Sequence, residues 1–113
     1  NIADSHQKLA LAGMKTILVQ AKLKLRNDEE LNKEENAQYL TYFSLMLRAR
    51  ENQHYQFKIG MLDEGEWESM LISFKTLFKE QKHLEIWDFI KITFSDDFVA
   101  LVDEQINQTK LYG

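Results

Sequence analysis

The chain contains no cysteine and no proline, and only four of its 113 residues are glycine. Without cysteine it can form neither disulfides nor thiolate metal sites. Proline breaks the interior of a helix and glycine weakens it, so the scarcity of both favours long helices. No run approaches the roughly 20 apolar residues that span a bilayer. We therefore expect contact with a membrane only through a segment upstream of Asn1.

The remaining composition is that of a globular domain, with 44% hydrophobic, 12% aromatic and 28% charged residues. A chain of this length corresponds to one domain. We therefore predict a single helical domain over residues 1–113. It would comprise a basic terminal helix over residues 1–26 and a core bundle over residues 32–110.

Charge is unevenly distributed. The formal net charge is −4, which disfavours general binding to nucleic acid. Residues 1–26 carry five bases against Asp4 alone, a net charge of +4, whereas residues 27–35 carry five acids against Lys33, a net charge of −4. The first helix is therefore the basic element of an otherwise acidic chain.

Apolar spacing in the first segment predicts a helix over residues 5–26. Side chains three and four residues apart share one stripe of a helix, and here they are Leu11, Met14, Leu18, Ala21 and Leu25. Further apolar residues lie off this stripe, namely Leu9, Ile17, Val19 and Leu23. The apolar surface is therefore wider than one seam and indicates more than one neighbour.

Capping signals divide the rest of the chain. They are Asn32 with Glu35, Gly60, Asp63 with Glu66, and Ser95. The helices expected between them cover residues 32–59, 64–80, 84–90 and 95–110, with a break over residues 81–83. This order predicts an all-α fold, an antiparallel bundle of four to five helices.

The densest polar cluster lies on the second predicted helix and comprises Arg48, Arg50, Glu51, Asn52, His54 and Tyr55. Arg50 and His54 are four residues apart and so share a helical face. One interpretation makes them an anion-binding or acid–base pair. The favoured interpretation makes them surface pairs, or a hydrogen-bonded corner that holds this helix to its neighbours.

Arg48, five intervening residues and His54 also resemble the Arg-x(4–6)-His motif of the HEPN ribonucleases, which are all-helical. That resemblance would imply a metal-independent ribonuclease acting at a dimer interface. Ala49 stands where that family has a polar residue, and the acidic net charge counts against RNA binding. We keep this reading as the enzymatic alternative.

No metal or cofactor is expected. The three histidines, His6, His54 and His83, are far apart in the sequence, and the acids near Asp28 lack the spacing of a calcium loop. A small-ligand sensor with a pocket between Trp67 and Trp87 is a further alternative, although such tryptophans are usually core residues.

Three spaced patterns occur in the last two-thirds of the chain: Glu51-Asn52-x-x-Tyr55, Gly60-x-Leu62-Asp63-Glu64-x-x-Trp67 and Phe94-Ser95-x-x-Phe98-x-x-x-Val102-Asp103. Together they resemble the helical domain of a group of uncharacterised bacterial proteins. In that group a membrane helix often precedes the domain. No enzymatic activity is established for that group, so the resemblance suggests none for this chain.

These observations favour a non-enzymatic interaction or assembly module. We expect it to be cytoplasmic, at the inner face of a membrane if an upstream tether exists. Its partner would be another protein or a second copy of the chain, bound through the first helix.

Overall fold

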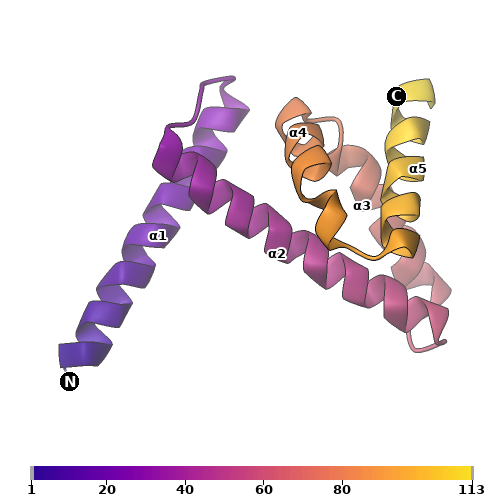
Figure 1. Ribbon diagram of the computed structural model, residues 1–113, viewed down its shortest axis with the longest axis horizontal. Coiled ribbons are helices and arrows are strands. Elements are labelled where there is room, and N and C mark those ends of the chain that lie inside the picture. Colours follow the sequence, from indigo (N-terminus) through magenta and orange to yellow (C-terminus); the bar gives the residue numbers. More distant parts are fainter. Residues whose placement is uncertain (1, 113) are drawn as a thin grey trace. The chain divides into compact units, whose positions relative to one another are not determined.

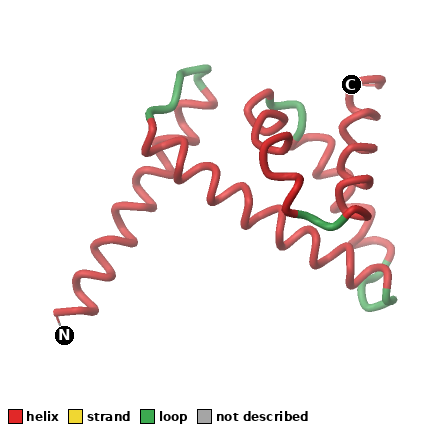
Figure 2. Tube along the Cα trace, viewed as in Figure 1, coloured by secondary structure: helices red, strands yellow, loops and turns green. Residues whose placement is uncertain are grey.

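The computed structural model describes the backbone of residues 2–112 and the side chains of residues 4–111. This part of the chain forms α-helices joined by short loops and contains no strand (Figures 1 and 2). The elements are α1 (Ile2–Arg26), α2 (Lys33–Lys58), α3 (Glu64–Leu77), α4 (Gln81–Ile90), the 3₁₀ helix η1 (Lys91–Thr93) and α5 (Asp96–Tyr112). The predicted all-α fold class with up to five helices is confirmed.

The contacts divide the chain into two compact units, Asn1–Tyr42 and Phe43–Gly113, and the division falls within α2. The first unit holds α1 and the first turns of α2. The second unit holds the rest of α2 with α3, α4, η1 and α5.

In the first unit, the start of α2 is fixed by the capping box that the sequence predicts. The backbone N–H of Glu35 donates to Asn32 Oδ1 at 2.8 Å, and the N–H of Asn32 donates to Glu35 Oε1 at 2.9 Å. Lys24 Nζ of α1 also donates to Glu35 Oε1 at 2.8 Å. The Lys24 ammonium, and then the Asn32 N–H, hold the pKa of Glu35 below its usual range.

Asp28 ends α1 in a manner that the sequence did not signal. It adopts a left-handed conformation with φ 55°, which aspartate tolerates better than most residues. The N–H of Glu29 then reaches the carbonyl of Lys24 at 2.8 Å, and the N–H of Asp28 reaches that of Leu25 at 3.2 Å. These are the two bonds of a Schellman motif, with aspartate in the place usually taken by glycine.

The second unit is built around an aromatic core in which neighbouring ring centroids lie 5.5–6.3 Å apart. Its buried members are Phe43, Phe74, Phe78, Trp87, Phe94 and Phe98. Trp87 is 1% exposed, and its indole N–H donates to Asp103 Oδ1 of α5 at 2.8 Å. Figure 1 shows α3, α4 and α5 grouped beside the second half of α2.

Two other predicted caps are confirmed in this unit. Gly60 has φ 79° and ends α2, where its N–H and that of Met61 bond the carbonyls of Phe57 and Gln56. The carboxylate of Asp63 accepts the N–H of Glu66 at 2.8 Å and so begins α3.

The predicted break over residues 81–83 is wrong. The helix α3 ends at Leu77 rather than at residue 80, and α4 already begins at Gln81. Glu80 caps α4 by accepting the N–H of Lys82 at 3.5 Å. His83 Nδ1 lies 2.7 Å from the carbonyl oxygen of Leu77, which can only accept, so Nδ1 carries the proton and caps the end of α3.

Candidate functional site

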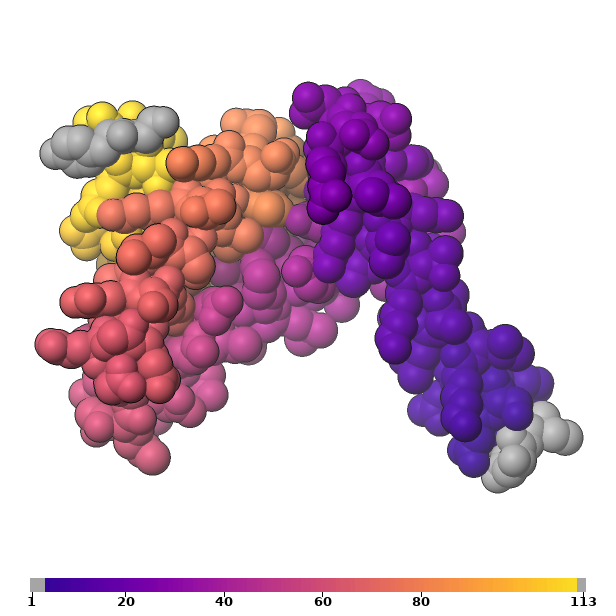
Figure 3. Space-filling view, turned by 180° about the vertical axis from the view of Figure 1, so that it is seen from behind, coloured from indigo at the N-terminus to yellow at the C-terminus, as the bar shows by residue number. Residues whose placement is uncertain are grey.

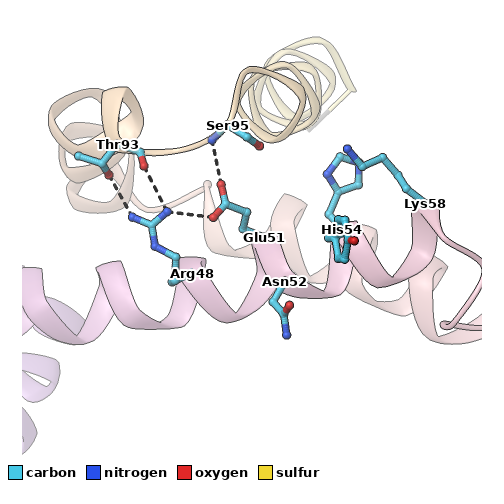
Figure 4. A pocket seen from close by; sticks show the side chains of 8 residues that line it. Arg48, Glu51, Asn52, His54, Lys58, Thr93 and Ser95 are labelled. Atoms are coloured by element: carbon cyan, nitrogen blue, oxygen red, sulfur yellow. Dashed lines mark hydrogen bonds and ion pairs between the residues drawn. The ribbon is translucent and has the colours of Figure 1, made fainter.

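Five of the six residues of the predicted polar cluster line one pocket of about 690 Å³ in the second unit. They are Arg48, Glu51, Asn52, His54 and Tyr55, and they are joined there by Lys58, Thr93 and Ser95. The pocket lies where α2 faces the junction between η1 and α5 (Figure 4). The sixth residue, Arg50, instead lines a separate pocket and donates to Gln53 at 2.9 Å.

Arg48 is held on several sides. Its guanidinium donates to Glu51 Oε1 at 2.9 Å, and to the carbonyl and hydroxyl oxygens of Thr93 at 3.2 and 3.3 Å. It also lies over the ring of Phe94, 4.0 Å from the centroid. These contacts tie α2 to η1, a 3₁₀ helix that the sequence did not predict.

Glu51 completes the corner from the α5 side. Its Oε2 accepts the backbone N–H of Ser95 at 2.9 Å, while Ser95 Oγ accepts the N–H of Phe98 at 3.3 Å and begins α5 (Figure 4). Partial burial of Glu51 raises its pKa, but the bonds from Ser95 and Arg48 outweigh that effect and lower the pKa overall. A carboxylate of the chain itself therefore occupies the position at the start of α5 where an external anion would bind.

His54 lies deeper in the same region and stacks on Trp67, with ring centroids 5.2 Å apart. Burial, and then the nearby charge of Lys58, lower the pKa of His54 below its usual value. Lys58 is itself paired with Asp97 at 2.8 Å. Asn52 points away from the hydrogen bonds that join Arg48 and Glu51 to the junction (Figure 4).

This geometry places Arg48 and Glu51 in a hydrogen-bonded corner, one of the two structural interpretations that the sequence left open for the cluster. The Arg48 guanidinium is engaged by Glu51 and Thr93, and the ribonuclease alternative stays a prediction. The two tryptophans pack separately in the core. Trp67 stacks on Phe57 with centroids 4.4 Å apart, and Trp87 contacts Phe94.

Among the described side chains, no group of three histidine, aspartate or glutamate residues is placed to hold a metal ion. Within the same residues, no helix combines the length and the apolar character needed to cross a bilayer.

A second candidate site is the surface of α1. The predicted stripe, called here the first stripe, faces the beginning of α2. Ala21 is fully buried, and two contacts to α2 flank it, because Lys24 bonds Glu35 while Lys22 Nζ lies 4.2 Å from the ring centroid of Tyr42. Leu11 and Met14, at the N-terminal end of the same stripe, are exposed.

On the opposite side of α1 lies a second stripe with the same heptad spacing: Leu9, Ala12, Thr16, Val19 and Leu23. Successive residues turn by 100°, so this stripe is centred about half a turn from the first. Leu9, Val19 and Leu23 are 71%, 55% and 47% exposed. In Figure 3 the first turns of α2 do not cover the indigo part of α1 on the face shown.

Thr16 is compatible with an apolar seam despite its hydroxyl. Its Oγ1 donates to the carbonyl of Ala12 at 3.0 Å within α1. The polar group is therefore satisfied by the helix itself, and burying the side chain would not leave a donor unpaired.

The chain matches no known family, no curated protein and no solved structure, so its resemblance to a bacterial helical domain stays a prediction.

Proposed function

We propose that this protein is a non-enzymatic interaction module that binds an α-helix of a partner protein along the second stripe of α1. The observation that carries the proposal is the exposure of Leu9, Val19 and Leu23 on one face of a helix whose opposite face meets α2 only near its C-terminal end, around Ala21. Covering such side chains on binding contributes about 25 cal/mol per Å² of apolar surface removed from water.

The shape of the stripe supports a helical partner. Its residues are spaced alternately three and four apart over two heptads, which is the narrow seam of a coiled coil rather than the wide apolar face of a helix that lies on a membrane. Small residues in its middle, Ala12 and Thr16, let a second helix approach closely. The segment also contains no aromatic residue that would anchor it at a lipid interface.

A synthetic helical peptide tests the proposal directly. The peptide carries leucine at both seam positions of three heptads and glutamine at the flanking positions, and it is titrated into the full chain by calorimetry. We expect saturable binding that the double substitution Leu9→Ser, Val19→Ser abolishes. Both side chains are exposed, so the variant should keep its helical circular dichroism.

Ile92→Ser is the matched control, because Ile92 is 89% exposed but lies in the second unit. It should bind the peptide as the unchanged chain does. If no binding occurs, or if the double substitution leaves binding intact, the second stripe is not a helix-binding surface.

A further inference from the structure

The residues beside the second stripe indicate the chemistry of the partner. Lys8, Lys15 and Lys22 each directly precede a residue of the stripe, so they follow one edge of it at heptad spacing. The other edge carries His6, Gly13 and Gln20, none of which is an acid. The stripe therefore has one flank of lysines and one flank without an acid, a lysine or an arginine.

Among the described side chains, no ion pair joins these lysines to an acid of their own helix. Asp4 is the only acid in α1, and Lys24 is the α1 residue that forms an ion pair in the described part of the chain. Lys8 and Lys15 are exposed and lie beyond the segment of α1 that faces α2. Charges at the flanks of a helical seam select partner and orientation through ion pairs across the interface.

A second copy of α1 does not supply those ion pairs. In an antiparallel pair each flank meets the same flank of the other helix, so a pair centred on Lys15 would place Lys15 against Lys15 and Lys8 against Lys22. Like charges placed in this way are destabilising. In a parallel pair the lysines would face the other flank, with Gly13 and Gln20 opposite them, and would gain no partner.

We infer that the second stripe of α1 recognises an amphipathic helix that carries glutamate or aspartate beside its apolar seam. The inference rests on the proposed function and deepens it by giving the partner's charge. The acids would pair with Lys8 and Lys15, and the apolar seam would cover Leu9, Val19 and Leu23.

Three peptides that share one leucine seam test the charge. Their flanking positions carry glutamate, glutamine or lysine, and each is titrated into the full chain at concentrations where the peptide alone is monomeric. At low salt we expect the glutamate peptide to bind about threefold to tenfold more tightly than the glutamine peptide, and the lysine peptide to bind more weakly than either. The difference should shrink as salt screens the charges.

Charge reversal provides the sharper control. The double substitution Lys8→Glu, Lys15→Glu should invert the ranking so that the lysine peptide binds most tightly, while affinity for the glutamine peptide stays within about twofold of that of the unchanged chain. A variant that had merely unfolded would lose all three peptides.

The failures are distinguishable. If the glutamine peptide binds but the three affinities are equal, the charge inference is wrong and the proposed function stands. If no peptide binds, the proposed function itself is wrong. Two further results would show that another occupant covers the second stripe. A dimer seen by sedimentation, and dissociated by the double substitution Leu9→Ser, Val19→Ser, would make that occupant a second copy of the chain. Binding to phosphatidylserine vesicles that is abolished by Lys8→Glu, Lys15→Glu would make it a membrane surface.

Discussion

Removing the carboxylate of Glu51 should loosen the junction between η1 and α5 without disturbing the aromatic core. In Glu51→Ala, the N–H of Ser95 loses a bond of 2.9 Å and Arg48 loses another of the same length. A hydrogen bond contributes a net 0.5–1.5 kcal/mol or so, whereas a partly exposed ion pair contributes roughly 0.3–0.5 kcal/mol. We therefore expect the free energy of unfolding to fall by about 1–2 kcal/mol.

Thermal unfolding followed by far-ultraviolet circular dichroism would measure the change. For a domain of this size, the expected loss corresponds to a decrease in Tm of roughly 4–8 °C. Glu51→Gln keeps an oxygen that can accept from Ser95, so it should cost about half as much or less. Glu68→Ala is the matched control, since Glu68 is an exposed acid on α3 and its loss should change stability by about 0.5 kcal/mol at most.

The same argument predicts a dependence on pH. The pKa of Glu51 is lower in the folded chain than in the unfolded chain, so its contribution is fully present above the unfolded value of 4.5 and is lost as pH falls through the folded value. The difference between Glu51→Ala and the unchanged chain should therefore shrink in acid. A Tm for Glu51→Ala equal to that of Glu68→Ala, or equal losses for Glu51→Ala and Glu51→Gln, would refute this account of the corner.

Other substitutions test the core, the caps and the first unit. Phe98→Ala empties a fully buried site and should lower the free energy of unfolding by about 3–5 kcal/mol in urea titrations, whereas Ile72→Ala, at an exposed position, should change it by about 0.5 kcal/mol or less. Gly60→Ala forces an L side chain into a positive φ and should lower Tm by an amount equivalent to about 1–2 kcal/mol. Gly13→Ala adds a Cβ to open space inside a helix and should instead raise helicity; equal effects of the two would contradict the cap assignment. The ion pair of Glu35 with Lys24 should stabilise the unchanged chain fully above pH 4.5, the unfolded pKa of Glu35, and this contribution should be lost as pH falls through the lower folded pKa. Glu35→Gln should lack this contribution at every pH. Identical pH profiles of Tm for the two chains would show that the Glu35 pair contributes nothing.

Local signals in the sequence were enough to predict most helix boundaries. A capping box or a glycine with positive φ acts over a few residues, so Asn32, Gly60 and Asp63 could be assigned without knowing the tertiary fold. The end of α3 could not be assigned in this way. The ring of His83 bonds the carbonyl of Leu77, six residues earlier, and it can do so only after the chain has turned. Helical spacing continues through Phe78 and offers no warning of that turn.

The polar cluster on α2 could be located from the sequence, but its bonding could not. Helical geometry brings Arg48 and Glu51 together because they are three residues apart. Their other partners, Thr93 and Ser95, are more than forty residues away, and the 3₁₀ turn that presents Thr93 has no distinct sequence signal. The excess of apolar residues on α1 was visible in the sequence. The sequence did not show which face of α1 meets α2, because that follows from the contacts of Lys24 with Glu35 and of Lys22 with Tyr42.

Both tryptophans, Trp67 and Trp87, belong to the unit that begins at Phe43. Tryptophan fluorescence will therefore report the unfolding of that unit. It will not report the unfolding of the hairpin formed by α1 and the start of α2, which contains no tryptophan. The hairpin holds two of the four tyrosines, Tyr42 and the buried Tyr39, so tyrosine emission reports partly on it. Comparing the two chromophores along one denaturation curve would reveal whether the two parts of this chain unfold together or in succession.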